Sequence, residues 1–435
     1  MGLYDSVKNR GHELLAAPMC FLLKTNDNEE LWMPGEKPIF KLNDGGYAAE
    51  AYGRSKSASG IELSFQSRID YDGFNWLNFR LERLKQHTIQ QLTLVIKFCA
   101  DETPFFHAVA NTIRPNPAGA LPDHWTGSQL IRKKHFGEEV MHPQLVPYLW
   151  LGGEERGLSW FIDSSFGFKL NRDKDAVRIF RKDDVVIAEL DIINIPTSFT
   201  SEKLEFSFGF HPTPVKPLTQ DLRNTLYDMH GAAPTAMNNA QFIYGDYLGG
   251  FFPWGLAPFN NEYTMWRDIM KALTRGEKLN YKKEWEQWDQ QYWEDFSQVL
   301  NSTAGNTEYA ANFRKRRDGF VHGNLGHHQR RPSLPYIYLD PRLAFKWYEE
   351  VQYFRSEWWN PAAQNYFGTW RIFPTSSYRD YFLHCMDLAL KNGLHGIYLD
   401  DVYIMPDNNP DTEAIVDEQG EVHSRIGILA LRDLI

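Results

Sequence analysis

Residues 59–73, SGIELSFQSRIDYDG, carry the pattern that decides the fold of the first half of this chain of 435 residues. Apolar and polar residues alternate along the stretch, which is typical of a strand with one buried and one exposed face. The apolar face comprises Ile61, Leu63, Phe65, Ile69 and Tyr71. The pair Asp72-Gly73 predicts a tight turn into a second strand, residues 74–84, so the two segments should form a hairpin.

The same alternation recurs up to about residue 215, for example in KLEFSFGF, residues 203–210. Short runs of this kind, separated by Gly, Pro, Asp and Asn, predict an antiparallel β-sandwich domain over residues 1–215. The prolines of HPTPVKPL, residues 211–218, cannot continue a strand ladder and stiffen the chain. We therefore place a linker at residues 216–240.

From residue 241 onward, strand-like and helix-like segments alternate. The strand-like segments are residues 335–340, 365–373 and 396–400, and the helix-like segments are residues 280–300, 341–354 and 376–393. Strands that alternate with helices are parallel, and a (β/α)8-type barrel is the usual solution in a large enzyme domain. The sequence thus predicts a multidomain β plus α/β protein, with the barrel as catalytic domain over residues 241–435.

The expected barrel is short. We find about four strand-like segments in it, whereas a closed eight-stranded barrel takes ~250 residues. We therefore expect an incomplete barrel and a chain that is a fragment. The first residues look internal and lack the order of a signal peptide, so the localisation stays open.

The stretch GLHGIYLDDVY, residues 393–403, is the strongest candidate for chemistry, because a strand ends there in Asp400 and Asp401. Alternation sends Tyr398 and Asp400 to the same side, which in a barrel is the open mouth. Barrel enzymes carry their chemistry at the carboxyl ends of strands. The alternative is structural: Asp401 caps the next turn and Asp400 pairs with an arginine.

Other residues are candidates for substrate contacts. Glu357 and Trp358 in SEWWNP, residues 356–361, offer a carboxylate beside flat rings, as in a sugar-binding platform. The alternative is an aromatic pair packed on the core. Asp246 and Trp370 are further expected substrate contacts.

Composition narrows the classes of partner. The net charge is -10 and no basic block appears, which argues against nucleic acid. No apolar run reaches the ~18 residues of a membrane helix, so no membrane partner is expected. The three cysteines form no metal signature, and the segment 321–333, which contains three histidines, is predicted to be a polar loop. Neither a metal nor a cofactor is therefore expected.

Two segments of the sandwich half resemble a known family. The segments VPYLWLGGEERGLSWFIDS, residues 146–164, and FSFGFHPTPVKPL, residues 206–218, look like the N-terminal module associated with glycoside hydrolase family 123. Residues 376–403 resemble the barrel segment that follows this module in related large proteins. The resemblance implies a β-sandwich and a (β/α)8-type barrel that act on glycosidic bonds.

The resemblance also implies roles for the two aspartates. Characterised members are retaining exo-β-N-acetylgalactosaminidases in which the acetamido oxygen of the substrate is the nucleophile. An adjacent Asp-Glu pair assists it, so Asp400 would orient the acetamido group and Asp401 would be the general acid/base. Here Asp stands in place of the Glu and is one methylene shorter. Either Asp401 acts through a shifted loop, or Glu357 or a residue beyond this chain supplies the acid, or the activity differs.

These patterns together predict a glycoside hydrolase that acts on an oligosaccharide or glycan substrate. The reaction that the resemblance implies is that of a retaining β-N-acetylhexosaminidase or galactosaminidase with substrate assistance. The alternative is a non-catalytic carbohydrate-binding or scaffold protein in which the aromatic side chains hold glycans and an incomplete barrel does no chemistry. Fold alone does not choose between them.

Overall fold

The hairpin that residues 59–84 predict is present in the computed structural model, as strands β7 (Glu62–Asp70) and β8 (Asn75–Glu82). The strands pair antiparallel from Glu62 opposite Glu82 to Ile69 opposite Asn75. The turn between them is stabilised by the Asp72 carboxylate, which accepts the backbone N–H of Phe74 at 3.0 Å. Gly73 takes a φ of 84°, which favours glycine and explains the Asp-Gly pair.

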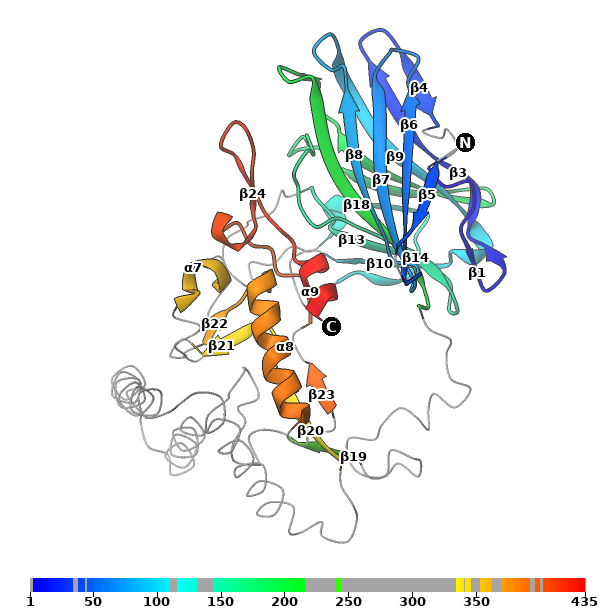
Figure 1. The fold of residues 1–435 in the computed structure, drawn as a ribbon. Coiled ribbons are helices and arrows are strands. Elements are labelled where there is room, and N and C mark those ends of the chain that lie inside the picture. Colours follow the sequence, from blue (N-terminus) through cyan, green and yellow to red (C-terminus); the bar gives the residue numbers. More distant parts are fainter. Residues whose placement is uncertain are drawn as a thin grey trace. The chain divides into compact units, whose positions relative to one another are not determined.

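The structure describes most of the first half of the chain and parts of the second (Figure 1). The described residues are 3–33, 38–43, 45–109, 116–130, 144–215, 240–243, 334–339, 341–345, 353–361, 369–391, 396–399 and 402–434. Packing divides the chain into two units. The first comprises Met1–Leu218, Ile404–Pro410 and Ala414–Ile428, and the second comprises Thr219–Tyr403, Asp411–Glu413 and Leu429–Ile435. The expected linker, apart from Ala240, lies outside the described residues.

Two antiparallel sheets form the first unit. The nine-stranded sheet has the order β11-β10-β13-β14-β18-β8-β7-β6-β5. Its remaining strands are β5 (Ile39–Leu42), β6 (Ala48–Lys56), β10 (Phe105–Val109), β11 (Ala118–Ala120), β13 (Tyr148–Gly152), β14 (Gly157–Phe161) and β18 (Lys203–Thr213).

The seven-stranded sheet has the order β12-β15-β16-β9-β3-β4, and β17 pairs with β9 beside this path. Its strands are β3 (Leu15–Thr25), β4 (Glu29–Trp32), β9 (Thr88–Cys99), β12 (His124–Thr126), β15 (Val177–Lys182), β16 (Val185–Ile193) and β17 (Thr197–Ser198). Two small hairpins add β1 (Lys8–Asn9) with β2 (His12–Glu13), and β24 (Ile415–Val416) with β25 (Val422–His423). Short 3-10 turns are η1 (Ala100–Glu102) and η2 (Gly127–Gln129).

A core rich in aromatic rings holds the two sheets together. Phe79 of β8 stacks on Phe206 of β18 with ring centroids 5.0 Å apart, and Phe21 of β3 meets Phe79 edge-on at 5.7 Å. All three rings are buried and belong to one apolar cluster that contains residues of both sheets. The alternation in the sequence therefore indicated correctly which faces of β7 and β18 turn inward. Tyr71 is an exception and is 79% exposed, because it lies in the turn after β7.

The chain returns to the first unit near its C-terminal end, with residues 404–410 and 414–428. The anchor is Asp163, whose buried carboxylate lies 2.6 Å from Nη2 of Arg425 and accepts the backbone N–H of Ile428 at 2.7 Å. Ile426 lies between these contacts and is fully buried in the core cluster. This return was not foreseen from the sequence.

The second unit contains three parallel strands in the order β19-β20-β23, namely β19 (Ala240–Ile243), β20 (Leu334–Leu339) and β23 (Gly396–Leu399). A separate antiparallel pair is formed by β21 (Leu343–Phe345) and β22 (Thr369–Arg371). The other elements are α7 (Arg355–Trp358), α8 (Ser376–Lys391), η5 (Pro410–Thr412) and α9 (Ile428–Leu434).

The expected fold class, a sandwich followed by a (β/α)8-type barrel, is wrong. The structure is mostly β-sheet, and its described residues contain only the three helices α7, α8 and α9, whereas a barrel needs a helix after every strand. The expected helix at residues 341–354 begins instead as strand β21. The expected barrel strand at residues 365–373 pairs antiparallel with it as β22. Short apolar runs fit a helix or a strand equally well, which is why their spacing misled. No helix among the described residues is long and apolar enough to cross a membrane.

We predict that Phe79→Ala destabilises the first unit by about 3–5 kcal/mol, because it removes a buried ring that contacts both sheets and leaves a cavity. The free energy of unfolding in urea measures this loss. Leu42→Ala is the matched control and should change it by about 0.5 kcal/mol or less, because Leu42 is exposed on edge strand β5. An equal effect of the two substitutions would contradict the assignment of this core.

Candidate functional site

The structure leaves part of the predicted catalytic site outside the described residues. Asp400, Asp401 and Asp246 all belong to that part of the chain. Tyr398 lies in β23, the last of the three parallel strands, as the sequence predicts for its backbone. The catalytic roles of Asp400 and Asp401 and the substrate contacts of Asp246 and Tyr398 therefore stay predictions.

The register of the parallel strands reveals a residue that the sequence analysis missed. Strands β20 and β23 pair from Tyr336 with Gly396 to Leu339 with Leu399. The sequence continues from both paired ends with an aspartate, Asp340 after Leu339 and Asp400 after Leu399. The repeated motif Ile-Tyr-Leu-Asp, at residues 337–340 and 397–400, was a signal for this in the sequence. Neither aspartate is among the described residues.

Two of the predicted substrate contacts, Glu357 and Trp358, lie together in helix α7. Ser377 at the start of α8 connects them: its hydroxyl donates to the Glu357 carboxylate and accepts the Trp358 indole N–H at 2.7 Å. Trp358 is 1% exposed and stacks on Phe354 with centroids 4.8 Å apart. Its ring faces are therefore occupied by protein, which corresponds to the alternative of a packed aromatic side chain.

Trp370, another predicted substrate contact, belongs to a different cluster. It stacks on Trp359 with ring centroids 5.5 Å apart. The guanidinium of Arg355 lies over both rings, 4.9 Å from the Trp359 centroid and 5.1 Å from that of Trp370. Such cation–π contacts stabilise a planar stack. Trp370 thus stacks on Trp359, whereas Trp358 stacks on Phe354, and the roles of Trp358 and Trp370 toward a substrate remain predictions.

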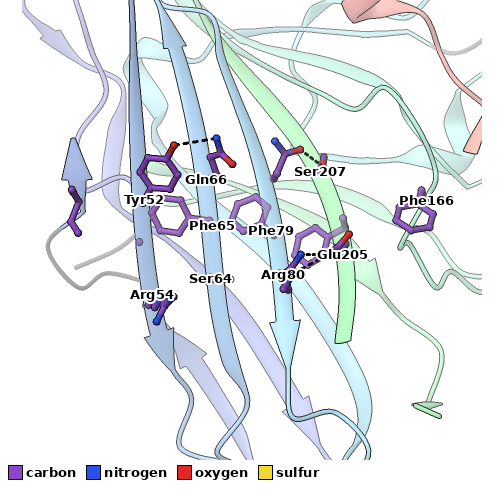
Figure 2. Close-up of a pocket in the computed structure, with 14 residues that line it drawn as sticks. Tyr52, Arg54, Ser64, Phe65, Gln66, Phe79, Arg80, Phe166, Glu205 and Ser207 are labelled. Atoms are coloured by element: carbon purple, nitrogen blue, oxygen red, sulfur yellow. Dashed lines mark hydrogen bonds and ion pairs between the residues drawn. The ribbon is translucent and has the colours of Figure 1, made fainter. Parts of the chain in front are cut away.

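A groove of 800 Å³ crosses the outer face of the nine-stranded sheet (Figure 2). Its centre is a row of outward-pointing side chains from neighbouring strands: Tyr52 of β6, Gln66 of β7, Asn78 of β8 and Ser207 of β18. The pairing registers place each of these residues directly opposite the next. The same alternation that buries the phenylalanines therefore builds an uncharged polar row on the opposite face.

Hydrogen bonds connect the polar row within the groove. Ser207 donates to the Asn78 side chain at 2.7 Å, and the Gln66 amide donates to the Tyr52 hydroxyl at 3.4 Å. The Tyr52 hydroxyl donates to Glu50, and this hydrogen bond raises the pKa of Tyr52. These exposed amides and hydroxyls can exchange their partners for those of a ligand.

A second row beside the first carries the charges of the groove. Arg80 contacts Glu205 through Nε at 2.8 Å and Nη2 at 2.7 Å, so these two charges neutralise each other. Arg54 lies on the same face, opposite Ser64. None of the lining residues is a buried carboxylate or an activated nucleophile, so the groove has the chemistry of recognition rather than of bond cleavage.

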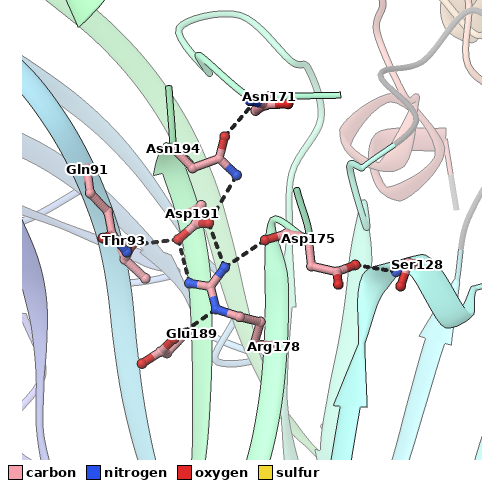
Figure 3. Close-up of polar contacts among 9 residues, drawn as sticks. All are labelled: Gln91, Thr93, Ser128, Asn171, Asp175, Arg178, Glu189, Asp191 and Asn194. Carbon is pink, nitrogen blue, oxygen red and sulfur yellow. Dashed lines mark hydrogen bonds and ion pairs between the residues drawn. The ribbon is translucent and has the colours of Figure 1, made fainter. Parts of the chain in front are cut away.

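A polar network on the seven-stranded sheet differs from the groove because its groups are bonded to one another (Figure 3). Arg178 of β15 binds both oxygens of the buried Asp191 carboxylate at 2.8 Å. Thr93 donates to one of these oxygens at 2.6 Å and Asn194 donates to the other at 3.1 Å. The Asp191 carboxylate raises the pKa of Arg178 further above its usual range. Because each Asp191 oxygen already accepts two hydrogen bonds, we interpret the network as structural.

The β24–β25 hairpin brings together Asp417, Glu421 and His423, whose potential metal-ligand atoms lie within 4.8 Å of one another. One Asp417 oxygen accepts the backbone N–H groups of Gln419 at 3.0 Å and Glu421 at 2.8 Å, and the other lies 3.1 Å from His423 Nε2. The hydrogen bond to His423 lowers the pKa of Asp417. The carboxylate is thus used to close the hairpin.

Comparison with protein families shows which known family the sandwich part resembles. Residues 3–173 match the family model named Glycoside hydrolase 123, third domain. The resemblance inferred from the sequence is therefore confirmed for this part of the chain. The name of the model designates a third domain, whereas the sequence analysis described an N-terminal module. A search of curated proteins found no match.

Solved structures with distant similarity include two α-galactosidases. The enzyme from Lactobacillus brevis is 8% identical with a TM-score of 0.28, and the match covers 90% of this chain and 52% of that one. A family 36 variant from Geobacillus stearothermophilus, in complex with raffinose, is 9% identical with a TM-score of 0.29, at coverages of 89% and 53%. This chain therefore spans about half the length of both. A GalM/aldose epimerase homologue from C. elegans is 8% identical with a TM-score of 0.24, at coverages of 49% and 80%. TM-scores this low carry no argument about fold or function.

We predict that Asp191→Asn lowers the free energy of unfolding by about 3 kcal/mol, because it leaves the Arg178 guanidinium without its buried carboxylate. Urea denaturation followed by tryptophan fluorescence measures the change. Glu205→Gln is the matched control, since it breaks an Arg–carboxylate pair of similar geometry that is exposed, and should cost about 0–1 kcal/mol. A loss below 1 kcal/mol for Asp191→Asn would show that the network contributes little.

We also predict a pH dependence of the β24–β25 hairpin. Because folding lowers the pKa of Asp417, its contribution to stability is present above the unfolded-state value of about 3.9 and is lost as the pH falls through the folded-state pKa. Hydrogen exchange of the Gln419 and Glu421 amides, corrected for intrinsic rates, should accelerate as the pH falls below about 3.9 and through the folded-state pKa. In Asp417→Asn their protection should not vary with pH. Unchanged protection of the wild-type amides on acidification would refute the role of the carboxylate.

Proposed function

We propose that this protein is a glycoside hydrolase. The observation that carries the proposal is the match of residues 3–173 to the third domain of glycoside hydrolase family 123. The first unit, which contains the matched residues, holds a groove lined by polar side chains and a closed polar network, so we assign the chemistry to the parallel strands of the second unit. Carboxyl ends of parallel strands are where α/β proteins place their ligands.

The proposed reacting groups are carboxylates that follow strands β20 and β23. Hydrolysis of a glycosidic bond ordinarily needs two carboxyl groups, one of which protonates the leaving oxygen. In the sequence, Asp340 and Asp400 directly follow Leu339 and Leu399, which pair with each other in neighbouring strands spaced ~4.8 Å apart. Asp340 is then an alternative to Asp401 for the second carboxyl group.

We further propose substrate assistance on a β-N-acetylhexosaminide. In this reaction the acetamido oxygen of the substrate attacks the anomeric carbon, while a general acid gives its proton to the departing oxygen. Asp400 orients the acetamido group and stabilises the oxazolinium ion that forms. Water then opens this ion with the same acid acting as base, so the anomeric configuration is retained. Asp340 or Asp401 supplies the acid and base.

The second candidate function is non-catalytic binding of carbohydrate. It is favoured by the groove on the first unit, which has hydroxyl and amide groups but no catalytic residues. Turnover separates the two functions, because a binding protein leaves every glycosidic bond intact.

The test is the rate of release of aryl alcohols from aryl β-N-acetylhexosaminides and from a panel of other aryl glycosides. Asp400→Asn should lower kcat by roughly 10²–10⁴-fold, because the variant cannot assist the acetamido group. Asp27→Asn, an exposed aspartate of the first unit, is the control and should behave as wild type. Turnover unchanged in Asp400→Asn, or no turnover of any glycoside, would overturn the proposal.

The same assay identifies the general acid. Loss of the acid slows substrates with a poor leaving group much more than those with an activated aryl group, which needs little protonation. We expect this pattern for only one of Asp340→Asn and Asp401→Asn.

A further inference from the structure

The groove on the nine-stranded sheet has a geometry suited to a chain-like ligand. Its polar row runs perpendicular to the strands, with one side chain from each of β6, β7, β8 and β18. Ile39 of β5 lies opposite Tyr52 and extends the row to a fifth strand. Neighbouring strands are spaced ~4.8 Å apart, so the row is roughly 19 Å long. A ligand that lies along it meets a new side chain at every strand, at a spacing similar to the length of one sugar ring.

The side chains of the row match the hydroxyl groups of sugars. Gln66 offers an amide donor and an acceptor, and the hydroxyls of Tyr52 and Ser207 can do both. Asn78 offers its amide N–H groups, because its side-chain oxygen accepts hydrogen bonds from Ser207 at 2.7 Å and from the Trp76 indole at 3.2 Å. Each sugar hydroxyl likewise donates and accepts, so such pairs are satisfied on both sides. The row contains no charge, and the neighbouring Arg80–Glu205 pair is neutralised.

Charge also narrows the choice of ligand. The whole chain carries a net charge of -10, yet the groove contains two arginines and one glutamate. A basic peptide is therefore disfavoured here. Arg54 has no ion pair with another described residue, and this single cation is too little for a nucleic acid backbone, which needs several. Arg54 presents a fork of N–H donors that suits hydroxyl or carboxylate oxygens of a sugar.

Rings at the two ends of the groove complete the match. Tyr52 is 38% exposed at one end, and Phe166 lines the other end. Phe166 is fixed by an edge contact with His423, with centroids 5.5 Å apart. Figure 2 shows both rings with Gln66 and Ser207 between them. Flat rings beside neutral polar groups can cover the apolar faces of pyranose rings.

We propose that this groove is an oligosaccharide-binding site, separate from the proposed catalytic strands, that holds a pyranose chain across strands β5 to β18. Tyr52 and Phe166 contact sugar faces, and Gln66, Asn78 and Ser207 bind hydroxyl groups. The inference does not require hydrolysis. If the proposed function holds, the groove keeps a polymeric substrate on the protein.

Binding is measured by calorimetry with neutral oligosaccharides of one to six units, including chains of glucose, galactose, mannose, xylose and N-acetylglucosamine. Uronate-containing chains form a second arm that distinguishes neutral from acidic sugars. The protein is the full chain carrying Asp400→Asn, so that no ligand is consumed. We expect affinity that rises with chain length up to about the span of the row.

Tyr52→Ala, and the double variant Gln66→Ala with Asn78→Ala, should each weaken binding by roughly tenfold or more. Tyr71→Ala is the control, because Tyr71 is an exposed tyrosine outside the groove and its loss should leave affinity unchanged. Ser64→Trp fills the groove without removing a contact and should abolish binding. All these side chains lie on the surface, and circular dichroism verifies that the variants fold.

The inference is overturned if no oligosaccharide binds at millimolar concentration, if the groove variants bind like wild type, or if affinity is independent of chain length. Its failure is distinct from that of the proposed function. Loss of turnover in Asp400→Asn with unaltered binding in the groove variants refutes the groove alone. Binding that needs the groove, in a protein without turnover, refutes the hydrolase alone.

Discussion

Burial of one face of every strand between the two sheets is the constraint on which the first unit depends. Phe21 of the seven-stranded sheet contacts Phe79 and Phe206 of the nine-stranded sheet across the interface, and each buried side chain of this size contributes about 1.5–3 kcal/mol by leaving water. Because the period of a strand is two residues, this burial also determines which residues point outward. The position of the groove is therefore a consequence of the core.

The outer faces of the two sheets carry different kinds of polar side chains. On the seven-stranded sheet, both carboxylate oxygens of Asp191 accept two hydrogen bonds each, from Arg178, Thr93 and Asn194, as a buried charge requires. On the nine-stranded sheet, Tyr52, Gln66 and Asn78 are exposed and their hydrogen bonds involve groups that water or a ligand can replace. The satisfied network stabilises the unit, and the open row offers a surface for recognition.

Residues 414–428 are held to the rest of the first unit through a buried charge. Asp163 follows β14 by two residues and binds both Arg425 and the backbone of Ile428. The segment LSWFIDS, residues 158–164, is part of the sequence that resembles family 123, so a motif that signalled relationship also carries a structural anchor. A cost arises if either partner is lost, because the other charge then remains buried without compensation.

The sequence by itself determined the strands of the hairpin, the inward faces of β7 and β18, and the resemblance of the sandwich part to family 123, because period-two alternation and local motifs are properties of neighbouring residues. It also indicated strand β23 and helix α8 within a residue or two of their ends. Only the tertiary structure decided that residues 343–345 and 369–371 pair antiparallel, that Trp358 is enclosed, and that Asp163 meets Arg425. The groove likewise joins residues 52 to 207, which come together only through strand pairing. Such contacts depend on which segments meet in space, and the spacing of apolar residues along the chain does not contain that information.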